Sequence, residues 1–154
     1  MVETVERFYS AFNGLDAEVM TNCYHDNIIF EDPAFGQLKA DRAKAMWQMI
    51  CASQKGKSFR VKCLHVHREN GIVKADWEAF YTFSKTGRSV HNKIKAQFEF
   101  KDGLIIKHID HFNLHKWAWQ AFGLKGWLIG KFPFFKNQLQ RQTNNALDNY
   151  LKNR

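Results

Sequence analysis

The sequence predicts an α+β domain in which helices cover one face of a curved antiparallel sheet. Three observations support this: apolar residues recur at helical spacing over residues 2–53, alternate with a period of two from Phe59 to Leu114, and return to helical spacing from Lys116. Helices followed by a long strand meander are typical of this class. A chain of 154 residues with 45% hydrophobic content suits one core and contains no internal repeat, so we expect a single domain over residues 1–154.

The segment before the sheet is expected to form three helices and one short strand. The first helix has an apolar stripe that stops at Asn13-Gly14, a helix terminator. Asp16 can cap a second helix whose apolar side extends to Tyr24. "NIIFEDP" then has the pattern of a short strand ending before Pro33, and a third helix is expected from about Asp41 to Ser53.

The main sheet is expected to be a meander of four strands. The turn segments "ENG", "SKTG" and "KDG" separate four alternating runs, which cover residues 59–68, 72–83, 89–101 and 104–114. Asn-Gly and Asp-Gly favour tight hairpin turns, so consecutive strands should pair antiparallel. The helical tail, residues 116–154, is expected to break near Gly123 to Pro133 and then to resume.

Alternation also assigns side chains to the two faces of this sheet. In the two central runs, 72–83 and 89–101, the face that should point away from the helices is polar except for Phe80, which could serve a dimer contact. Asn92 lies on the apolar face and therefore requires a partner, either Asp110 or a ligand. In the last run, 104–114, His108 and Asp110 lie on one face and Ile109 lies on the other. Which of these faces turns inward depends on how the strand pairs with its neighbour, and alternation does not fix that register. The apolar face of the central runs, expected toward the helices, contains Ala75, Trp77, Ala79, Tyr81, Phe83, Val90, Asn92, Ile94, Ala96, Phe98 and Phe100.

Charge and composition argue against several classes of function. The formal net charge of +8 comes from Lys and Arg that are spread along the chain without a long run of like charges, so we expect no nucleic-acid binding. The first residues lack the pattern of a secretory signal, and Cys23, Cys51 and Cys63 lack CxxC spacing, so we expect a cytoplasmic protein with reduced thiols. The histidines form no HExxH or Cys/His cluster, and we expect no metal site.

Five segments in order resemble the nuclear transport factor 2-like superfamily, specifically its SnoaL-like and ketosteroid-isomerase-like members. They are "VERFYSAFNGLD", "YHDNIIFEDPAFG", "TGRSVHNKIKAQFEF", "KDGLIIKHIDHFNL" and "WAWQAFGLKGWLIGKFPF", and the resemblance covers nearly the whole chain. It implies a cone-shaped α+β fold with a deep cavity between the helices and the concave sheet. It also implies that the Asp of "HIDHF", Asp110, points into this cavity, and that the outer sheet face forms a homodimer.

Two carboxyl groups are the candidate catalytic residues. In an apolar pocket Asp110 would act as a general acid or base, because desolvation raises a carboxyl pKa toward neutral pH; the alternative is a structural Asp that is hydrogen-bonded to a neighbouring His, Trp or Tyr. The resemblance places Asp32 at the cavity rim, where the pair could hold one protonated and one ionised carboxyl, as an enolisation or aldol-type cyclisation requires. The alternative for Asp32, directly before Pro33, is a turn-forming role.

The expected ligand site is apolar and needs no cofactor. Trp47, Trp77, Tyr81 and Phe98 should line the cavity with flat surface, although each could instead fill the core. Ketosteroid isomerases carry an oxyanion-donating Tyr on the first helix, and Tyr9 is the only Tyr there, with its neighbour Phe8 competing for the inward position; Tyr81 is a second possible donor. The remaining expected ligand contacts are Asn92, His108 and Phe112. Family members that open epoxides use an Arg and an Asp at positions that our register assigns to Trp77 and Ala79.

The tail contains a dense aromatic stretch, residues 117–135, that must be buried or covered. It could close the cavity as a lid, extend a dimer, or lie on a membrane surface with Lys125, Lys131 and Lys136 facing lipid phosphates; we favour the lid. Two functional hypotheses follow. The first is a cofactor-independent isomerase, cyclase or dehydratase that acts on a hydrophobic small molecule by Asp proton transfer. The second is a non-catalytic ligand-binding or protein-interaction domain of the same fold.

Overall fold

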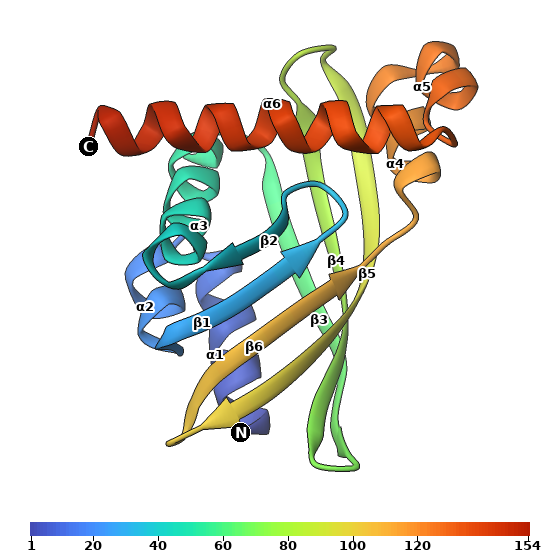
Figure 1. Cartoon of the computed structure of the whole chain (residues 1–154). Helices are drawn as coiled ribbons and strands as arrows, with labels where there is room; N and C mark the ends of the chain where they lie inside the picture. The colour runs from blue at the N-terminus through green and yellow to red at the C-terminus, as the bar shows by residue number, and fades with distance from the viewer.

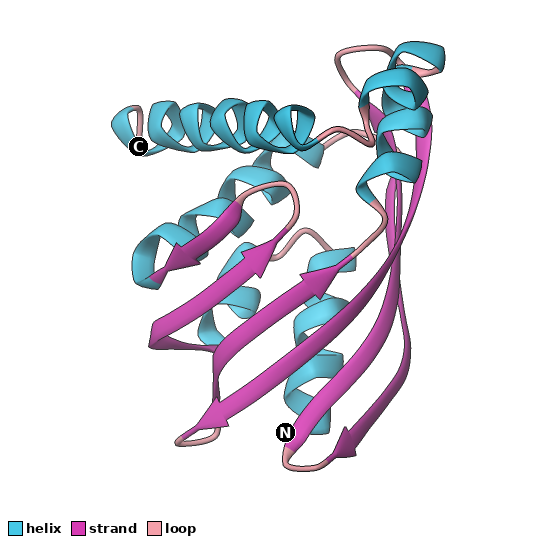
Figure 2. Cartoon of the chain, turned by 45° about the vertical axis from the view of Figure 1, so that its right-hand side comes forward, coloured by secondary structure: helices cyan, strands magenta, loops and turns pink.

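A computed structural model describes residues 1–154 as a curved six-stranded sheet with helices packed on one side (Figures 1 and 2). This arrangement confirms the α+β class. The helices are α1 (Val2–Asn13), α2 (Ala17–Asn22), α3 (Ala40–Gln54), α4 (Leu114–Phe122), α5 (Leu124–Ile129) and α6 (Pro133–Lys152). The strands are β1 (Tyr24–Asp32), β2 (Gly36–Lys39), β3 (Phe59–Glu69), β4 (Ile72–Phe83), β5 (Arg88–Lys101) and β6 (Leu104–His111).

The four-strand meander forms as the turn signals predict. The strand order is β2-β1-β6-β5-β4-β3, and β3 to β6 pair antiparallel with their neighbours in sequence. The tight turns use residues in the left-handed region: φ is 50° at Asn70 and 82° at Gly71, and 52° at Asp102 and 78° at Gly103. Positive φ at both central positions is what a type I′ hairpin turn requires.

The N-terminal end of the sheet differs from the sequence prediction. Tyr24 was expected at the end of the second helix, but α2 ends at Asn22 and Tyr24 begins β1. β1 lies parallel to β6, with an irregular register between Tyr24 and Ile29, so this one pairing departs from the expected antiparallel pattern. After Asp32 the chain turns and returns as β2, a strand that the sequence analysis missed. Helical periodicity alone could not reveal that Tyr24 is held in the sheet by long-range contacts.

The register of β6 settles which of its faces turns inward. Ala96 pairs with Asp110 and Phe98 pairs with His108, so both polar side chains face the helices, where His108 is fully buried and Asp110 is 4% exposed. The strand ends at His111, earlier than expected, because the Asn113 side chain caps α4 by accepting a hydrogen bond from the Lys116 N–H at 2.9 Å.

The core lies between α1, α2 and α3 and the concave face of the sheet. It includes the apolar stripe of α1 and the inward positions of β4 and β5 that alternation assigned. The outward positions of β4 from Lys74 to Thr82 and of β5 from His91 to Glu99 are polar apart from Phe80. Phe80 stacks on His91 with ring centroids 4.1 Å apart, and its ring centroid lies 4.5 Å from the Arg60 guanidinium carbon. No helix combines the length and the apolar character needed to cross a bilayer.

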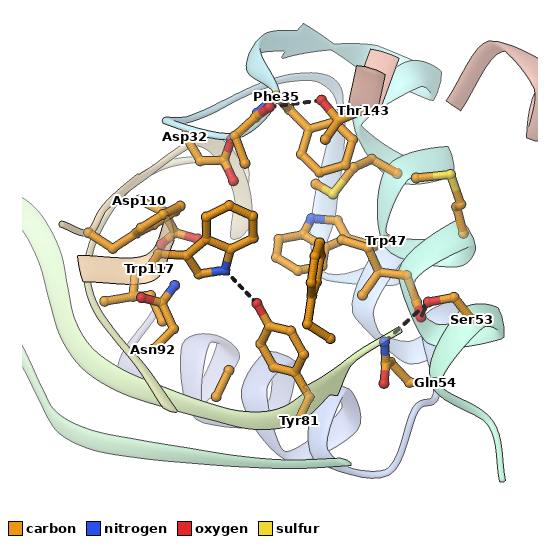
Figure 3. Close-up of a pocket in the computed structure, with 18 of the residues that line it drawn as sticks. Asp32, Phe35, Trp47, Ser53, Gln54, Tyr81, Asn92, Asp110, Trp117 and Thr143 are labelled. Atoms are coloured by element: carbon orange, nitrogen blue, oxygen red, sulfur yellow. Dashed lines mark hydrogen bonds between the residues drawn. The ribbon is translucent and has the colours of Figure 1, made fainter. Parts of the chain in front are cut away.

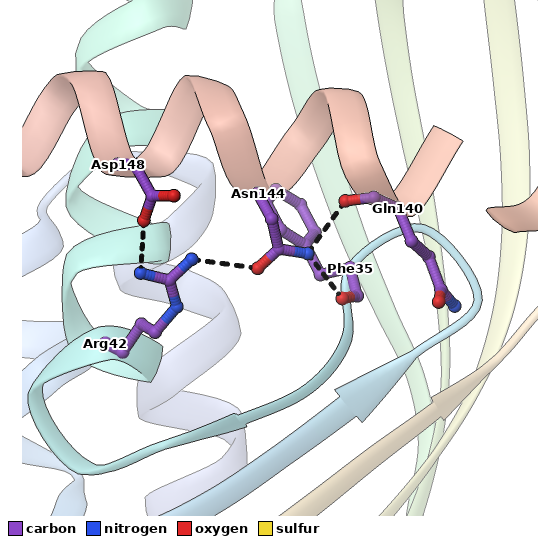
Figure 4. Close-up of polar contacts among 5 residues, drawn as sticks. All are labelled: Phe35, Arg42, Gln140, Asn144 and Asp148. Carbon is purple, nitrogen blue, oxygen red and sulfur yellow. Dashed lines mark hydrogen bonds and ion pairs between the residues drawn. The ribbon is translucent and has the colours of Figure 1, made fainter. Parts of the chain in front are cut away.

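The last helix, α6, crosses the open end of the sheet and is fixed by polar contacts (Figures 1 and 4). Arg42 of α3 donates hydrogen bonds to Asp148 at 2.5 Å and to the Asn144 side-chain oxygen at 3.0 Å. Asn144 in turn donates to the Phe35 carbonyl at 2.8 Å, and Thr143 donates to the Ala34 carbonyl at 2.8 Å. These bonds attach α6 to both α3 and the β1–β2 turn, so the tail closes over the concave side of the sheet.

Candidate functional site

A pocket of about 410 Å³ lies between the concave sheet, α3 and the tail helices (Figure 3). Of its 28 lining residues, 19 are hydrophobic, which suits an apolar ligand that is oriented by a few polar groups. Trp117 and Phe122 from α4 and Leu139 from α6 complete the wall. The tail therefore contributes part of the pocket wall, and its role as a lid stays a prediction.

Seven of the ten residues chosen from the sequence line this pocket. They are Asp32, Trp47, Trp77, Tyr81, Asn92, Asp110 and Phe112. Tyr9, Phe98 and His108 do not line it, because they lie in the core layer behind the wall. The Tyr9 ring packs against Trp77 and Phe98 at centroid distances of 5.2 and 6.1 Å, and its buried hydroxyl has no hydrogen-bond partner. The expected role of Tyr9 as an oxyanion donor in the pocket is therefore not supported by its position.

A buried chain of hydrogen bonds ends at Asp110. The Trp47 indole nitrogen lies 2.8 Å from the Tyr24 hydroxyl, which lies 2.7 Å from Nδ1 of His108. His108 Nε2 lies 3.0 Å from Oδ1 of Asp110, and the Trp77 indole nitrogen lies 3.2 Å from the same oxygen. All five side chains are buried, so each polar atom in the chain needs its partner.

The indole donor at the start of this chain of hydrogen bonds indicates the direction of the bonds that follow. An indole N–H can only donate, so the Tyr24 oxygen accepts from Trp47 and its own proton is directed to Nδ1 of His108. With this direction of the hydrogen bonds, Nδ1 of His108 accepts and its Nε2–H donates to Asp110. Oδ1 of Asp110 receives two hydrogen bonds, while Oδ2 has no partner within the protein and is not sealed in the core. The network therefore positions Asp110 with one oxygen free toward the pocket.

Asp32 lies on the same pocket wall as Asp110 and Asn92 (Figure 3). Its Oδ1 accepts a hydrogen bond from the Phe35 N–H at 2.6 Å, so the turn-forming role is also present. Burial raises the pKa of the Asp32 carboxyl to about 7, and the charge of Asp110 adds to the increase, against the opposing effect of the Phe35 and Ala34 backbone N–H groups. Near neutral pH a large fraction of Asp32 is thus protonated and can donate a hydrogen bond.

Tyr81 and Asn92 add two further polar groups. The Trp117 indole donates to the Tyr81 oxygen at 2.7 Å, which leaves the Tyr81 O–H free to donate to a ligand. Burial raises the pKa of Tyr81, so this phenol stays protonated. Asn92 makes no side-chain hydrogen bond, and in particular none to Asp110, so its amide is also left for a ligand.

Sequence analysis missed two residues that shape the site. Tyr24 bonds both Trp47 and His108, and since His108 lies 84 positions further along the sequence, no local pattern could have revealed this contact. Gln54, the last residue of α3, lies at the other end of the pocket with its buried side-chain oxygen unpaired. Its position at the end of an apolar helical stripe was the only available signal.

Two other chemistries can be assessed from the side chains present. No three His, Cys, Asp or Glu side chains come together as a cluster that could hold a metal ion. At the β4 positions where epoxide-opening relatives are expected to carry Arg and Asp, Trp77 and Ala79 face the pocket. Lys85 is the one basic residue among the lining residues.

The comparisons with known proteins agree with this fold. A family model described as a SnoaL-like domain matches residues 5–108. Bal32a from a soil-derived mobile gene cassette is 26% identical, with a TM-score of 0.65 over 78% of this chain and 93% of that one. A "putative polyketide cyclase" from Xanthomonas campestris pv. campestris is 18% identical, with a TM-score of 0.63 over 77% and 94% of the two chains. An LEH-like epoxide hydrolase from M. tuberculosis is 20% identical, with a TM-score of 0.61 over 84% and 90%. No curated protein matches the sequence.

Proposed function

This chain belongs to the SnoaL-like domain family, and from that premise we propose that its pocket binds an apolar small molecule and catalyses proton transfer on it without a cofactor. The substrate class is a carbonyl compound with a weakly acidic C–H next to the carbonyl group. The reaction would be an isomerisation, a cyclisation or a dehydration through an enolate.

The observation that supports this proposal is the environment of Asp110. Its Oδ1 is occupied by His108 and Trp77, so the carboxylate cannot rotate freely, and Oδ2 is the oxygen available to a substrate. Oδ2 would take the proton from carbon, and the electron pair of the broken C–H bond would move into the enolate. Return of the proton to a different carbon completes an isomerisation, whereas attack of the enolate on a second carbonyl carbon forms a ring.

The developing negative charge on the enolate oxygen needs hydrogen-bond donors. The pocket offers the free O–H of Tyr81, the protonated fraction of Asp32 and the Asn92 amide. Because Asp32 and Asp110 line one cavity but have different hydrogen-bond partners, the two carboxyls can take opposite roles, one as base and one as acid.

The structural relatives include both reaction classes, and the side chains of the pocket favour proton transfer over epoxide opening. One similar structure is a "putative polyketide cyclase" and another is a "putative isomerase" from Bacillus subtilis. Epoxide opening in relatives is expected to need the Arg and Asp that Trp77 and Ala79 replace. A proton-transfer enzyme requires only the carboxyls and donors that are already in place.

Asp110→Asn tests the proposal with minimal structural change, since the Asn side-chain oxygen can still accept from His108 and Trp77. Turnover would be followed on a panel of cyclic β,γ-unsaturated ketones by the absorbance of the conjugated product. Binding would be followed by quenching of tryptophan fluorescence, because Trp47, Trp77 and Trp117 line the pocket. Asp76→Asn, on the outer face of β4, is the matched control.

The expected result is that Asp110→Asn binds the ketone as the unchanged protein does but loses turnover by about 10²–10⁴-fold. Binding without turnover in the unchanged protein would instead support the second hypothesis, a non-catalytic ligand-binding domain. A folded Asp110→Asn variant with full turnover would remove Asp110 from the mechanism.

The expected cellular setting also stays a proposal. Cys23, Cys51 and Cys63 are free, and burial raises the pKa of the Cys51 and Cys63 thiols to about 11, which keeps them unreactive. Free thiols suit the reducing cytoplasm. The homodimer through the outer sheet face likewise remains a prediction, to be tested by sedimentation of the protein and of a Phe80→Ser variant.

A further inference from the structure

The aromatic stretch of the tail, residues 117–135, is only partly buried. Trp117 and Phe135 are buried in a small second core, and Phe122 packs against it. In contrast, a surface that we call the tail patch consists of Leu124, Trp127, Leu128, Ile129, Phe132 and Phe134, with exposed fractions of 71, 51, 51, 38, 46 and 55%. This part of the stretch is therefore left uncovered by the rest of the chain, and the dimer and membrane-surface alternatives stay open for it. An exposed apolar surface of this kind marks an interaction site.

The packing of α5 keeps the large side chains of the tail patch outside. Small residues form the inner side of this segment: an added Cβ at Gly126 would lie 1.9 Å from the Ala118 carbonyl oxygen, and one at Gly130 would lie 2.7 Å from the Ala118 Cβ. The α5 backbone thus lies directly on α4. Trp127 and Leu128 cannot turn inward without separating the two helices, so their exposure is built into the fold.

The stretch of chain that carries the tail patch is rich in positive charge. No Asp or Glu occurs between Asp110 and Asp148, whereas this stretch contains Lys116, Lys125, Lys131, Lys136 and Arg141, all of them exposed. The Lys131 ammonium lies 5.5 Å from the Phe132 ring centroid, and Phe132 stacks on Phe134 at 6.1 Å. Cationic and aromatic side chains therefore share one surface, which is the composition that binds the interface of an anionic bilayer.

We propose that the tail patch docks this protein on an anionic lipid bilayer surface. The charge pattern favours a bilayer over a second copy of the chain, because a symmetric contact would bring two positively charged surfaces together, and the stretch between Asp110 and Asp148 has no acidic residue to pair Lys125 or Lys131. The apolar side chains enter the headgroup region while the lysines contact lipid phosphates. The proposal goes beyond the pocket chemistry and does not depend on it.

Vesicle flotation of the full chain tests this proposal. The protein should float with phosphatidylcholine vesicles that contain about one third phosphatidylglycerol and should not float with phosphatidylcholine alone. Binding should be lost in about 1 M salt, where the Debye length is only about 3 Å. Replacing Lys125 and Lys131 together by Gln should weaken binding about 25-fold, since each lysine near an anionic surface contributes about fivefold.

A second variant tests the apolar contribution. Trp127→Ser combined with Phe134→Ser should weaken binding at least about tenfold, whereas Leu64→Ser, an exposed apolar residue on β3, should leave it unchanged. Circular dichroism and the melting temperature check that each variant is folded. Equal binding to both vesicle types, or no binding to either, would overturn the proposal. Self-association that depends on Trp127 without vesicle binding would assign the tail patch to a contact between copies and would also overturn it.

Discussion

Replacement of Asp32 by Asn should abolish a decrease in the free energy of unfolding that the unchanged protein shows as the pH rises. Burial in the pocket wall raises the pKa of the Asp32 carboxyl to about 7, so the folded chain keeps this proton up to neutral pH. In the unfolded chain the same carboxyl loses its proton near the ordinary pKa of 3.8. Between these two values the folded state binds more protons, so the free energy of unfolding falls as the pH rises through this window.

The size of the effect follows from the two pKa values. A difference between 3.8 and about 7 corresponds to on the order of 4 kcal/mol at 25 °C, reached only above pH 7. Because Asp32 is partly exposed, we expect about half of this value to be measured. Asn cannot ionise, yet its side-chain oxygen can still accept the hydrogen bond from the Phe35 N–H.

Urea denaturation at pH 4 and pH 8 measures this prediction. Asp32→Asn should match the unchanged protein near pH 4 and should be more stable by about 2 kcal/mol at pH 8. Glu31→Gln, an exposed carboxyl on the same strand, is the control and should show no such gain. If Asp32→Asn and the unchanged protein lose the same stability between the two pH values, Asp32 is not a desolvated carboxyl and its role as an acid fails.

Three further predictions concern the network, the tail and the donor. Tyr24→Phe should lower the free energy of unfolding by about 1–3 kcal/mol, because it leaves two buried partners unpaired; urea denaturation measures this, and a loss no greater than that of the control Tyr150→Phe, at a half-buried tyrosine whose hydroxyl bonds no other residue, would contradict it. Gly126→Ala should cost about 1–3 kcal/mol by forcing α5 away from α4, whereas Gly14→Ala, where a Cβ meets nothing closer than 3.5 Å, should not; equal melting temperatures would refute the close packing. Tyr81→Phe should slow turnover of a ketone substrate by about 10²-fold with little change in binding, and unchanged turnover would exclude Tyr81 as the enolate donor.

Much of the fold could be predicted from the sequence because its signals are local. The stripe of α1 and the Asn-Gly and Asp-Gly turns depend on neighbouring residues only, and both appear where expected. The single-domain organisation over residues 1–154 and the homodimer are predictions of a different kind, since they concern independent folding and association. β2 escaped prediction because its four residues carry too little alternation to distinguish a strand from a loop.

The candidate site was predictable only in part. Asp110 could be selected because a resemblance supplied the inward direction that alternation left open, and the Ala96 to Asp110 pairing now gives its physical basis. His108 was expected to contact the ligand but instead orients Asp110 from behind, because the Tyr24 hydroxyl holds its ring in the core. Contacts between residues 84 positions apart depend on the complete fold and leave no trace in a local pattern.

Proton exchange with solvent tests the central claim most directly, since it needs no knowledge of the natural product. A cyclic β,γ-unsaturated ketone would be incubated with the protein in D₂O, and the loss of its α-proton signal would be followed by ¹H NMR. We predict that the unchanged protein accelerates this exchange and that Asp110→Asn reduces the acceleration by about 10²–10⁴-fold while still binding the ketone. Exchange at the buffer rate while the ketone is bound, or equal rates for the two proteins, would contradict the claim that Asp110 transfers protons in this pocket.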